Sequence, residues 1–108
     1  MSARYVIRPK ADDDLDEHAF YLAEQAGAAI GHKFLIAAHE TFSLIATQPE
    51  MGWHPHLTHP AVSSLRLFRI SGFQQVLVLY APVKDGVDII RVIHGSRDID
   101  ALLRREGI

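Results

Sequence analysis

The chain has 108 residues, enough for one hydrophobic core but not for two, so we expect a single domain spanning residues 1–108. Hydrophobic residues make up 48% and charged residues 22%, with a formal net charge of −2, which excludes a disordered chain and the strongly basic class of nucleic-acid-binding proteins. The lack of cysteine excludes disulfides and thiolate metal sites, and since neither a membrane span nor a signal peptide is recognisable, we expect a cytoplasmic protein.

The first half of the chain is predicted to form one strand and two helices. Residues 4–8, RYVIR, are β-branched and aromatic, as is typical of a short strand. Pro9 suits the first turn of a helix, and the acids after it favour a helix N-terminus, so we expect a helix over roughly residues 10–25. After Gly27 a second helix with a wide apolar face continues to the segment TQPEMG. That wide face must pack on other elements, and we expect Phe34 to belong to the core with its neighbour Leu35.

The second half is predicted to form a loop, three strands and a short helix. Residues 53–64 have prolines, histidines and no clear period, which indicates a loop. The three strands are expected over residues 65–70, 74–81 and 87–94, and the Asp85-Gly86 pair is a strong hairpin turn signal between the last two. The closing segment RDIDALLRREGI is predicted to be a short helix that Asp98 caps and Gly107 ends.

This order of elements predicts an α+β fold with an antiparallel sheet. The expected order is β-α-α-β-β-β followed by a short C-terminal helix, with the helical hairpin packed on one face of the sheet. No segment is an obvious cover for the other face, and we expect function there.

Three histidines in the predicted loop raise the question of a metal site. His54, His56 and His59 are spaced closely enough to share one ion, but structural zinc sites usually combine histidines with thiolates, which this chain lacks. We therefore expect ordinary loop histidines and no metal. The sequence also has no serine nucleophile elbow and no glycine-rich phosphate loop, so no cofactor is predicted.

Cationic side chains collect on the predicted sheet. They are Arg66, Arg69, Arg91, His94 and Arg97, with Tyr80 on the central strand. Cleavage of RNA needs a base, an acid and a cation that stabilises the phosphorane, and arginine and histidine can supply all three. The simpler alternative is that Arg91 pairs with an acid or with a partner chain, while His94 packs at the end of the sheet.

The alternation of the last strand bears on this choice. Regular alternation directs Arg91 and Ile93 to one face and Ile90, Val92 and His94 to the other. Arg91 and His94 then share a face only if the strand breaks its alternation near Gly95.

The sequence resembles the ParE/RelE superfamily, the toxins of type II toxin–antitoxin systems. The resemblance covers essentially the whole chain through the segments RPKADDDLDEHAFYLAEQAG, FLIAAHETFSLIATQPEMG, LRLFRI and QVLVLYAPVKDGVDIIRVIHGSRD. Its most specific parts are the P-x-M-G after the second helix and the closing RV-I-H-G-x-R-D.

The resemblance implies a small toxin whose sheet and helical hairpin are held by the C-terminal segment of a ParD-like antitoxin. ParE-type toxins poison DNA gyrase, whereas RelE-type toxins cut messenger RNA on the ribosome. The chain is closer to the ParE branch, because its only lysines are Lys10, Lys33 and Lys84, its net charge is negative and no tyrosine follows His94.

The resemblance to the ParE branch implies a gyrase inhibitor that acts by binding, without sequence-specific contacts to nucleic acid. On this interpretation the partner-facing cations are Arg66, Arg69, Arg91 and Arg97. The alternative is a RelE-like ribosome-dependent endoribonuclease, in which Arg91 and either Arg66 or Arg69 hold the phosphate and His94 is the acid–base group.

Overall fold

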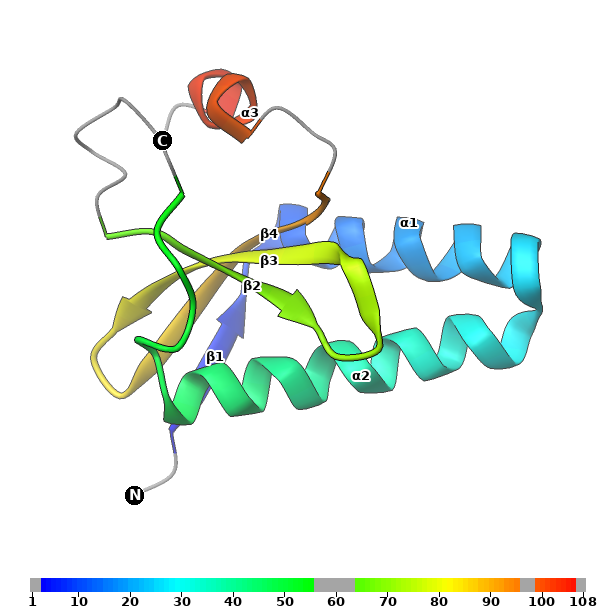
Figure 1. Cartoon of the computed structure of the whole chain (residues 1–108), viewed down its shortest axis with the longest axis horizontal. Coiled ribbons are helices and arrows are strands. Elements are labelled where there is room, and N and C mark those ends of the chain that lie inside the picture. Colours follow the sequence, from blue (N-terminus) through cyan, green and yellow to red (C-terminus); the bar gives the residue numbers. More distant parts are fainter. Residues whose placement is uncertain (1–2, 56–63, 96–98, 107–108) are drawn as a thin grey trace.

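The computed structural model describes residues 3–55, 64–95 and 99–106. The elements follow the predicted order (Figure 1), and their bounds are β1 Arg4–Ile7, α1 Pro9–Ala26, α2 Ala28–Thr47, β2 Arg66–Ile70, β3 Phe73–Val83, β4 Gly86–His94 and α3 Ile99–Glu106. The predicted elements are therefore confirmed within a few residues at each end. The predicted cap Asp98 and stop Gly107 of α3 lie outside the described residues.

The four strands form one sheet in the order β1-β4-β3-β2. The strands β2, β3 and β4 are antiparallel to their neighbours as predicted, but β1 runs parallel to β4. The expectation of a wholly antiparallel sheet was thus wrong, and the sheet is mixed. Tight turns force only consecutive strands to be antiparallel, and the helical hairpin and two strands separate β1 from β4, so no turn constrains their relative direction.

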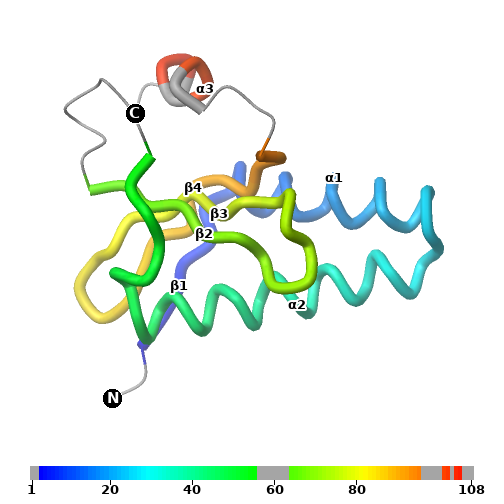
Figure 2. The backbone as a smooth tube through the Cα atoms, viewed as in Figure 1, coloured from blue at the N-terminus to red at the C-terminus, as the bar shows by residue number. Residues whose placement is uncertain are grey.

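The two long helices run side by side as a hairpin against one face of the sheet (Figure 2). The turn between them is at Gly27, whose φ of 102° is a conformation that residues with a Cβ rarely adopt. Phe34 is fully buried, as predicted, and Leu35 is partly buried against the same core. The buried members of this core are Ala11, Leu15, Phe34, Ala38, Phe42, Ile45, Ala46, Ile70, Val76, Val78, Tyr80, Val87, Ile89 and Val92.

The second face of the sheet is covered by α3, contrary to the expectation that nothing covers it. Leu102 of α3 is only 3% exposed and belongs to a separate apolar cluster. Its other buried members are Leu65, Leu67, Leu77, Leu79, Ile90 and Ile93. The amphipathic α3 covers this face because burial removes the leucine and isoleucine side chains of the sheet from water.

A β-bulge interrupts the alternation of β4. Leu79 pairs with Arg91 and Tyr80 pairs with Ile89, so Ile90 has no residue opposite it on β3. As a result Val92 packs in the core under the helices, whereas Ile90 packs in the cluster under α3. The prediction that Ile90 and Val92 share a face was wrong, because an extra residue in one strand shifts the alternation of those that follow.

Candidate functional site

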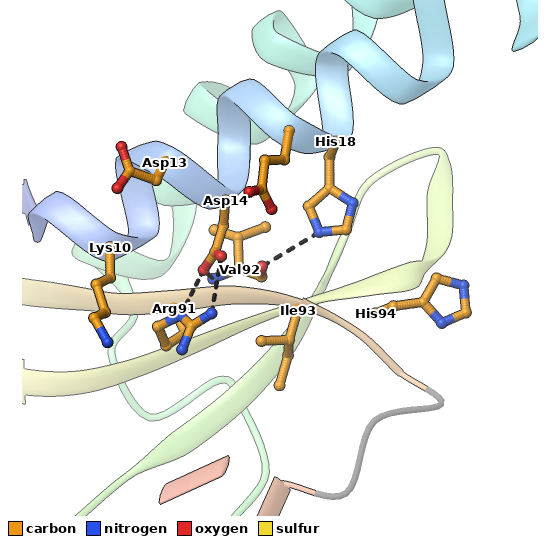
Figure 3. A pocket seen from close by; sticks show the side chains of 9 residues that line it. Lys10, Asp13, Asp14, His18, Arg91, Val92, Ile93 and His94 are labelled. Carbon is orange, nitrogen blue, oxygen red and sulfur yellow. Dashed lines mark hydrogen bonds and ion pairs between the residues drawn. The ribbon is translucent and has the colours of Figure 1, made fainter. Parts of the chain in front are cut away.

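The polar side chains of the candidate site lie at the point along β4 where its pairing with β1 ends and side chains of α1 bond to its backbone instead. The pairing of β1 ends beside Ile89, whose carbonyl accepts the N–H of Arg8 at 3.0 Å. Farther along the same strand, Oδ2 of Asp14 accepts the backbone N–H of Val92 at 2.9 Å, and Nε2 of His18 lies 3.3 Å from the Val92 carbonyl oxygen (Figure 3). Two side chains one helical turn apart thus satisfy backbone groups that a longer β1 would have paired.

Arg91 is held in place by the same carboxylate. Its Nε donates to Oδ2 of Asp14 at 2.7 Å and its Nη2 donates to Oδ1 at 3.0 Å, with side chains that are 11% and 10% exposed. This two-pronged ion pair joins α1 to β4 with the geometry that favours arginine. Of the alternatives open from the sequence, the structure shows that Arg91 pairs with an acid.

A polar cavity of about 520 Å³ lies beside this ion pair, between α1 and the end of β4 (Figure 3). The cavity brings together Arg91 and His94, two of the three residues of the nuclease hypothesis. His94 is exposed, and its Nε2 lies 3.1 Å from Oε1 of Gln75. The lining residues are Lys10, Asp13, Asp14, Glu17, His18, Arg91, Val92, Ile93 and His94. Charges of both signs therefore line the cavity.

Arg66 lies elsewhere and holds the turn that follows α2. Its Nη1 donates to the carbonyl oxygens of Gly52 at 2.6 Å and Glu50 at 3.1 Å. In the same turn the hydroxyl of Tyr80 donates to the Pro49 carbonyl at 2.7 Å and accepts the N–H of Gly52 at 3.0 Å. The two side chains are opposite each other on β2 and β3, so the sheet positions both against the turn.

Close packing therefore explains the glycine of the P-x-M-G motif, Gly52. A Cβ at Gly52 would lie 2.6 Å from both the Leu67 carbonyl oxygen and the Tyr80 hydroxyl, so only glycine fits there without a shift. Burial raises the pKa of Tyr80 above its ordinary value of 10.0, although the Gly52 N–H and the Arg66 charge act in the opposite direction.

Of the remaining predicted cations, Arg69 is exposed and stacks on an aromatic ring. Its guanidinium carbon lies 4.8 Å from the centroid of the Trp53 ring, within the range of a cation–π contact. Trp53 is 38% exposed and its backbone pairs with Leu67 at the free edge of β2. Arg97 lies outside the described residues.

The loop histidines are only partly described. Nδ1 of His54 lies 3.1 Å from the Leu65 carbonyl oxygen, while His56 and His59 lie outside the described residues. Across residues 3–55, 64–95 and 99–106, no three histidine or acidic side chains are grouped as a metal site would require. In the same residues, no helix is long and apolar enough to cross a membrane.

The cations predicted as one constellation are therefore distributed over separate places. Arg91 and His94 line the polar cavity, whereas Arg66 does not line it and bonds to the turn at residues 49–52. Asp14 and His18 were not predicted as residues of the site. The helical spacing of α1 could have indicated them, because Asp14 follows Ala11 by three residues and precedes His18 by four. This places both polar residues on the packed face of the helix with Ala11 and Leu15, where a charged side chain needs a partner.

The mixed sheet, the helical hairpin and the covering α3 define a small α+β domain of the RelE/ParE type. Comparison with known proteins narrows this class to one family. The sequence model of the family described as "ParE toxin of type II toxin-antitoxin system, parDE" matches residues 5–99, so the chain belongs to this family.

One solved structure supports the same fold. A chain of the "Chromosomal ParDE TA system from P. aeruginosa" is similar with a TM-score of 0.68 and 16% sequence identity, covering 87% of this chain and 95% of that chain. A search of curated proteins gave no match.

Proposed function

We propose that this ParE-family toxin acts by binding and inhibiting DNA gyrase, and that a ParD-like antitoxin neutralises it in the cytoplasm. The family match supports the toxin class, and the similarity to a ParDE system supports an antitoxin of the ParD type as partner. The observation that favours binding over RNA cleavage is the separation of Arg66 and Arg69 from the cavity that Arg91 and His94 line.

The geometry gives little support to the alternative, a RelE-like endoribonuclease. A nuclease needs its phosphate-binding cations and its acid–base group around one phosphate. Here the Arg91 guanidinium is bound to Asp14, and Arg66 bonds to carbonyl groups of the turn at residues 49–52. The sheet face that α3 covers is lined by leucine and isoleucine side chains, which cannot transfer protons.

Among the four arginines that we expected to face partners, Arg69 is the best placed in the described residues. It is exposed, and its stacking on Trp53 creates a surface with two residue types that commonly dominate binding energy at interfaces. We propose that Arg69, with Arg97, contacts the antitoxin. Arg66 and Arg91 remain candidates, but their contacts within the chain mean that their substitution also affects folding.

Induced expression with two measurements tests the proposed function. We expect the supercoiling of a reporter plasmid to fall and gyrase–DNA cleavage complexes to accumulate, while transcripts stay intact. Rapid transcript cutting with normal supercoiling would contradict gyrase inhibition and favour the nuclease.

The exposed His94 gives a second test. We expect His94→Ala to keep its toxicity, because inhibition of gyrase by binding needs no acid–base group at this exposed position. A variant that folds normally but loses toxicity together with transcript cutting would instead assign an acid–base role to His94.

A further inference from the structure

A groove with an apolar lining runs along the outer side of α2. It has a volume of about 620 Å³, and residues 71–72, in the turn between β2 and β3 that lies beside α2 in Figure 1, also line it. Ile36 and Leu44 line the groove and are 49% and 44% exposed. Two large aliphatic side chains exposed in one groove form an apolar patch, which is typical of a surface that binds another protein.

Two polar groups of the groove are already hydrogen-bonded to each other. Thr41 is 3% exposed, and its hydroxyl donates to the Ala37 carbonyl at 2.8 Å and accepts the N–H of Ser71 at 3.2 Å. Covering the groove therefore leaves neither the hydroxyl nor this N–H without a partner, which is the main cost of burying polar groups. Ala29 and Gly72 also line the groove, and such small residues allow a second helix to approach closely.

The α2 residues that line the groove form a stripe that is complementary to itself. The stripe contains Ala29, Lys33, Ile36, Glu40 and Leu44, at helical spacings of three and four residues. When two copies of α2 lie antiparallel with a two-fold axis between residues 36 and 37, Lys33 lies level with the second copy's Glu40, because each residue adds the same rise along the helix. Ale29 lies level with the second copy's Leu44 by the same geometry.

Both of these pairings are favourable. A base faces an acid, and a large side chain faces a small one, and the two-fold axis repeats each pair. A parallel arrangement would instead place Lys33 beside its own copy and Glu40 beside its own copy, so that like charges repel. Within the part of the chain that the structure describes, neither side chain is in an ion pair with its own chain.

We infer that this groove is the contact between two copies of the chain, which form a two-fold dimer through antiparallel α2 helices. The chain itself carries the complement of the stripe, so the pattern selects a second copy as the occupant rather than a different protein. The contact extends from Ala29 to Leu44, roughly 22 Å along the helix. A single pair of helices buries less surface than an obligate dimer does, so we expect the dimer to dissociate on dilution.

Charge exchange tests the inference with the purified chain in sedimentation equilibrium. The wild type should show a monomer–dimer equilibrium that added salt weakens. Lys33→Glu sets like charges opposite each other at two symmetric positions, and should raise the dissociation constant at least about tenfold. Lys33→Glu/Glu40→Lys restores both opposite-charge pairs and should return the constant to within about threefold of the wild type. The control Lys84→Glu, at an exposed lysine between β3 and β4, gives the same net charge as Lys33→Glu and should have little effect.

An introduced cysteine tests the direction of the two helices, because the chain has no cysteine of its own. In the antiparallel dimer the two copies of residue 36 lie next to the two-fold axis, whereas the two copies of residue 44 are roughly 22 Å apart along the helix. A disulfide requires Cα atoms within roughly 7 Å of each other. Ile36→Cys should therefore form a covalent dimer on oxidation, and Leu44→Cys at the same concentration should not.

Several results would overturn the inference, and none of these measurements involves gyrase. A wild-type chain that is monomeric at every concentration overturns it, and so does a dimer that Lys33→Glu leaves unchanged. Equal cross-linking through Leu44→Cys would show that the helices are not antiparallel. If the chain is monomeric and Lys33→Glu weakens its complex with an antitoxin, the groove binds the antitoxin instead. The substituted side chains are all exposed, and thermal unfolding checks that each variant folds.

Discussion

At the scale of single residues, Asp14 joins α1 to β4 by accepting hydrogen bonds from Arg91 and from the Val92 backbone. Asp14→Ala removes an acceptor of the largely buried Arg91 guanidinium and of the Val92 N–H, and the loss of one partner of a buried ion pair costs about 3–5 kcal/mol. Since whole domains are stable by only about 5–15 kcal/mol, we expect a large shift of the urea midpoint.

A second ion pair is the control for this prediction. Arg8 and Asp88 lie 3.3 Å apart, but their side chains are 49% and 28% exposed, so Asp88→Ala should cost about 1 kcal/mol or less. Equal losses of unfolding free energy for the two variants would show that burial of the Asp14 pair is unimportant.

Tyr80 makes the free energy of unfolding depend on pH in the alkaline range. Its folded-state pKa is raised by burial, so the folded protein favours the protonated hydroxyl; this contribution to stability is complete below pH about 10 and is lost as pH rises through the folded-state pKa. Tyr80→Phe removes the bonds to Pro49 and Gly52, which costs about 1–3 kcal/mol at neutral pH. Urea unfolding at pH 7 to 11 should show a shallower alkaline decline in this variant. Tyr21→Phe, at an exposed tyrosine, should retain the wild-type decline.

At the scale of elements, α3 is required for the stability of the fold, because it covers an apolar face of the sheet. Leu102→Ala removes a side chain that is 3% exposed, and we expect a loss of about 2–5 kcal/mol of unfolding free energy and greater binding of a hydrophobic dye. Val83→Ala, at a position that is 46% exposed on β3, is the control and should change the unfolding free energy by less than about 1 kcal/mol. If the two variants are equally stable, α3 does not protect this face.

The elements differ in how far the sequence predicts them. Helical spacing, Pro9, Gly27 and the Asp85-Gly86 turn are local signals, so the helices and the β3–β4 hairpin were predicted within a few residues. The parallel pairing of β1 with β4 and the bulge at Ile90 were missed, because strand partners far apart in sequence leave no local pattern. The Asp14–Arg91 pair is the same case, since 77 residues separate its members.

At the scale of the whole molecule, the two halves of the chain carry opposite charge. Residues 1–54 contain four basic and eight acidic side chains, and residues 55–108 contain seven basic and five acidic ones. The structure places many of the acids on α1, while Arg69 is exposed on β2 and Arg104 and Arg105 are exposed on α3. A toxin with this distribution can present surfaces of opposite charge to two different partners.

This distribution predicts that binding to the two partners can be separated by substitution. Arg69→Ala removes an exposed guanidinium stacked on Trp53, so the unfolding free energy should change by less than about 1 kcal/mol. Because arginine and tryptophan commonly dominate interface energies, antitoxin binding should weaken about tenfold or more, while gyrase inhibition is unchanged. Lys84→Ala, at another exposed cation, is the control and should leave both activities intact. Titration of each variant with antitoxin in a supercoiling assay measures both effects, and a loss of gyrase inhibition in Arg69→Ala would assign this cation to the target instead.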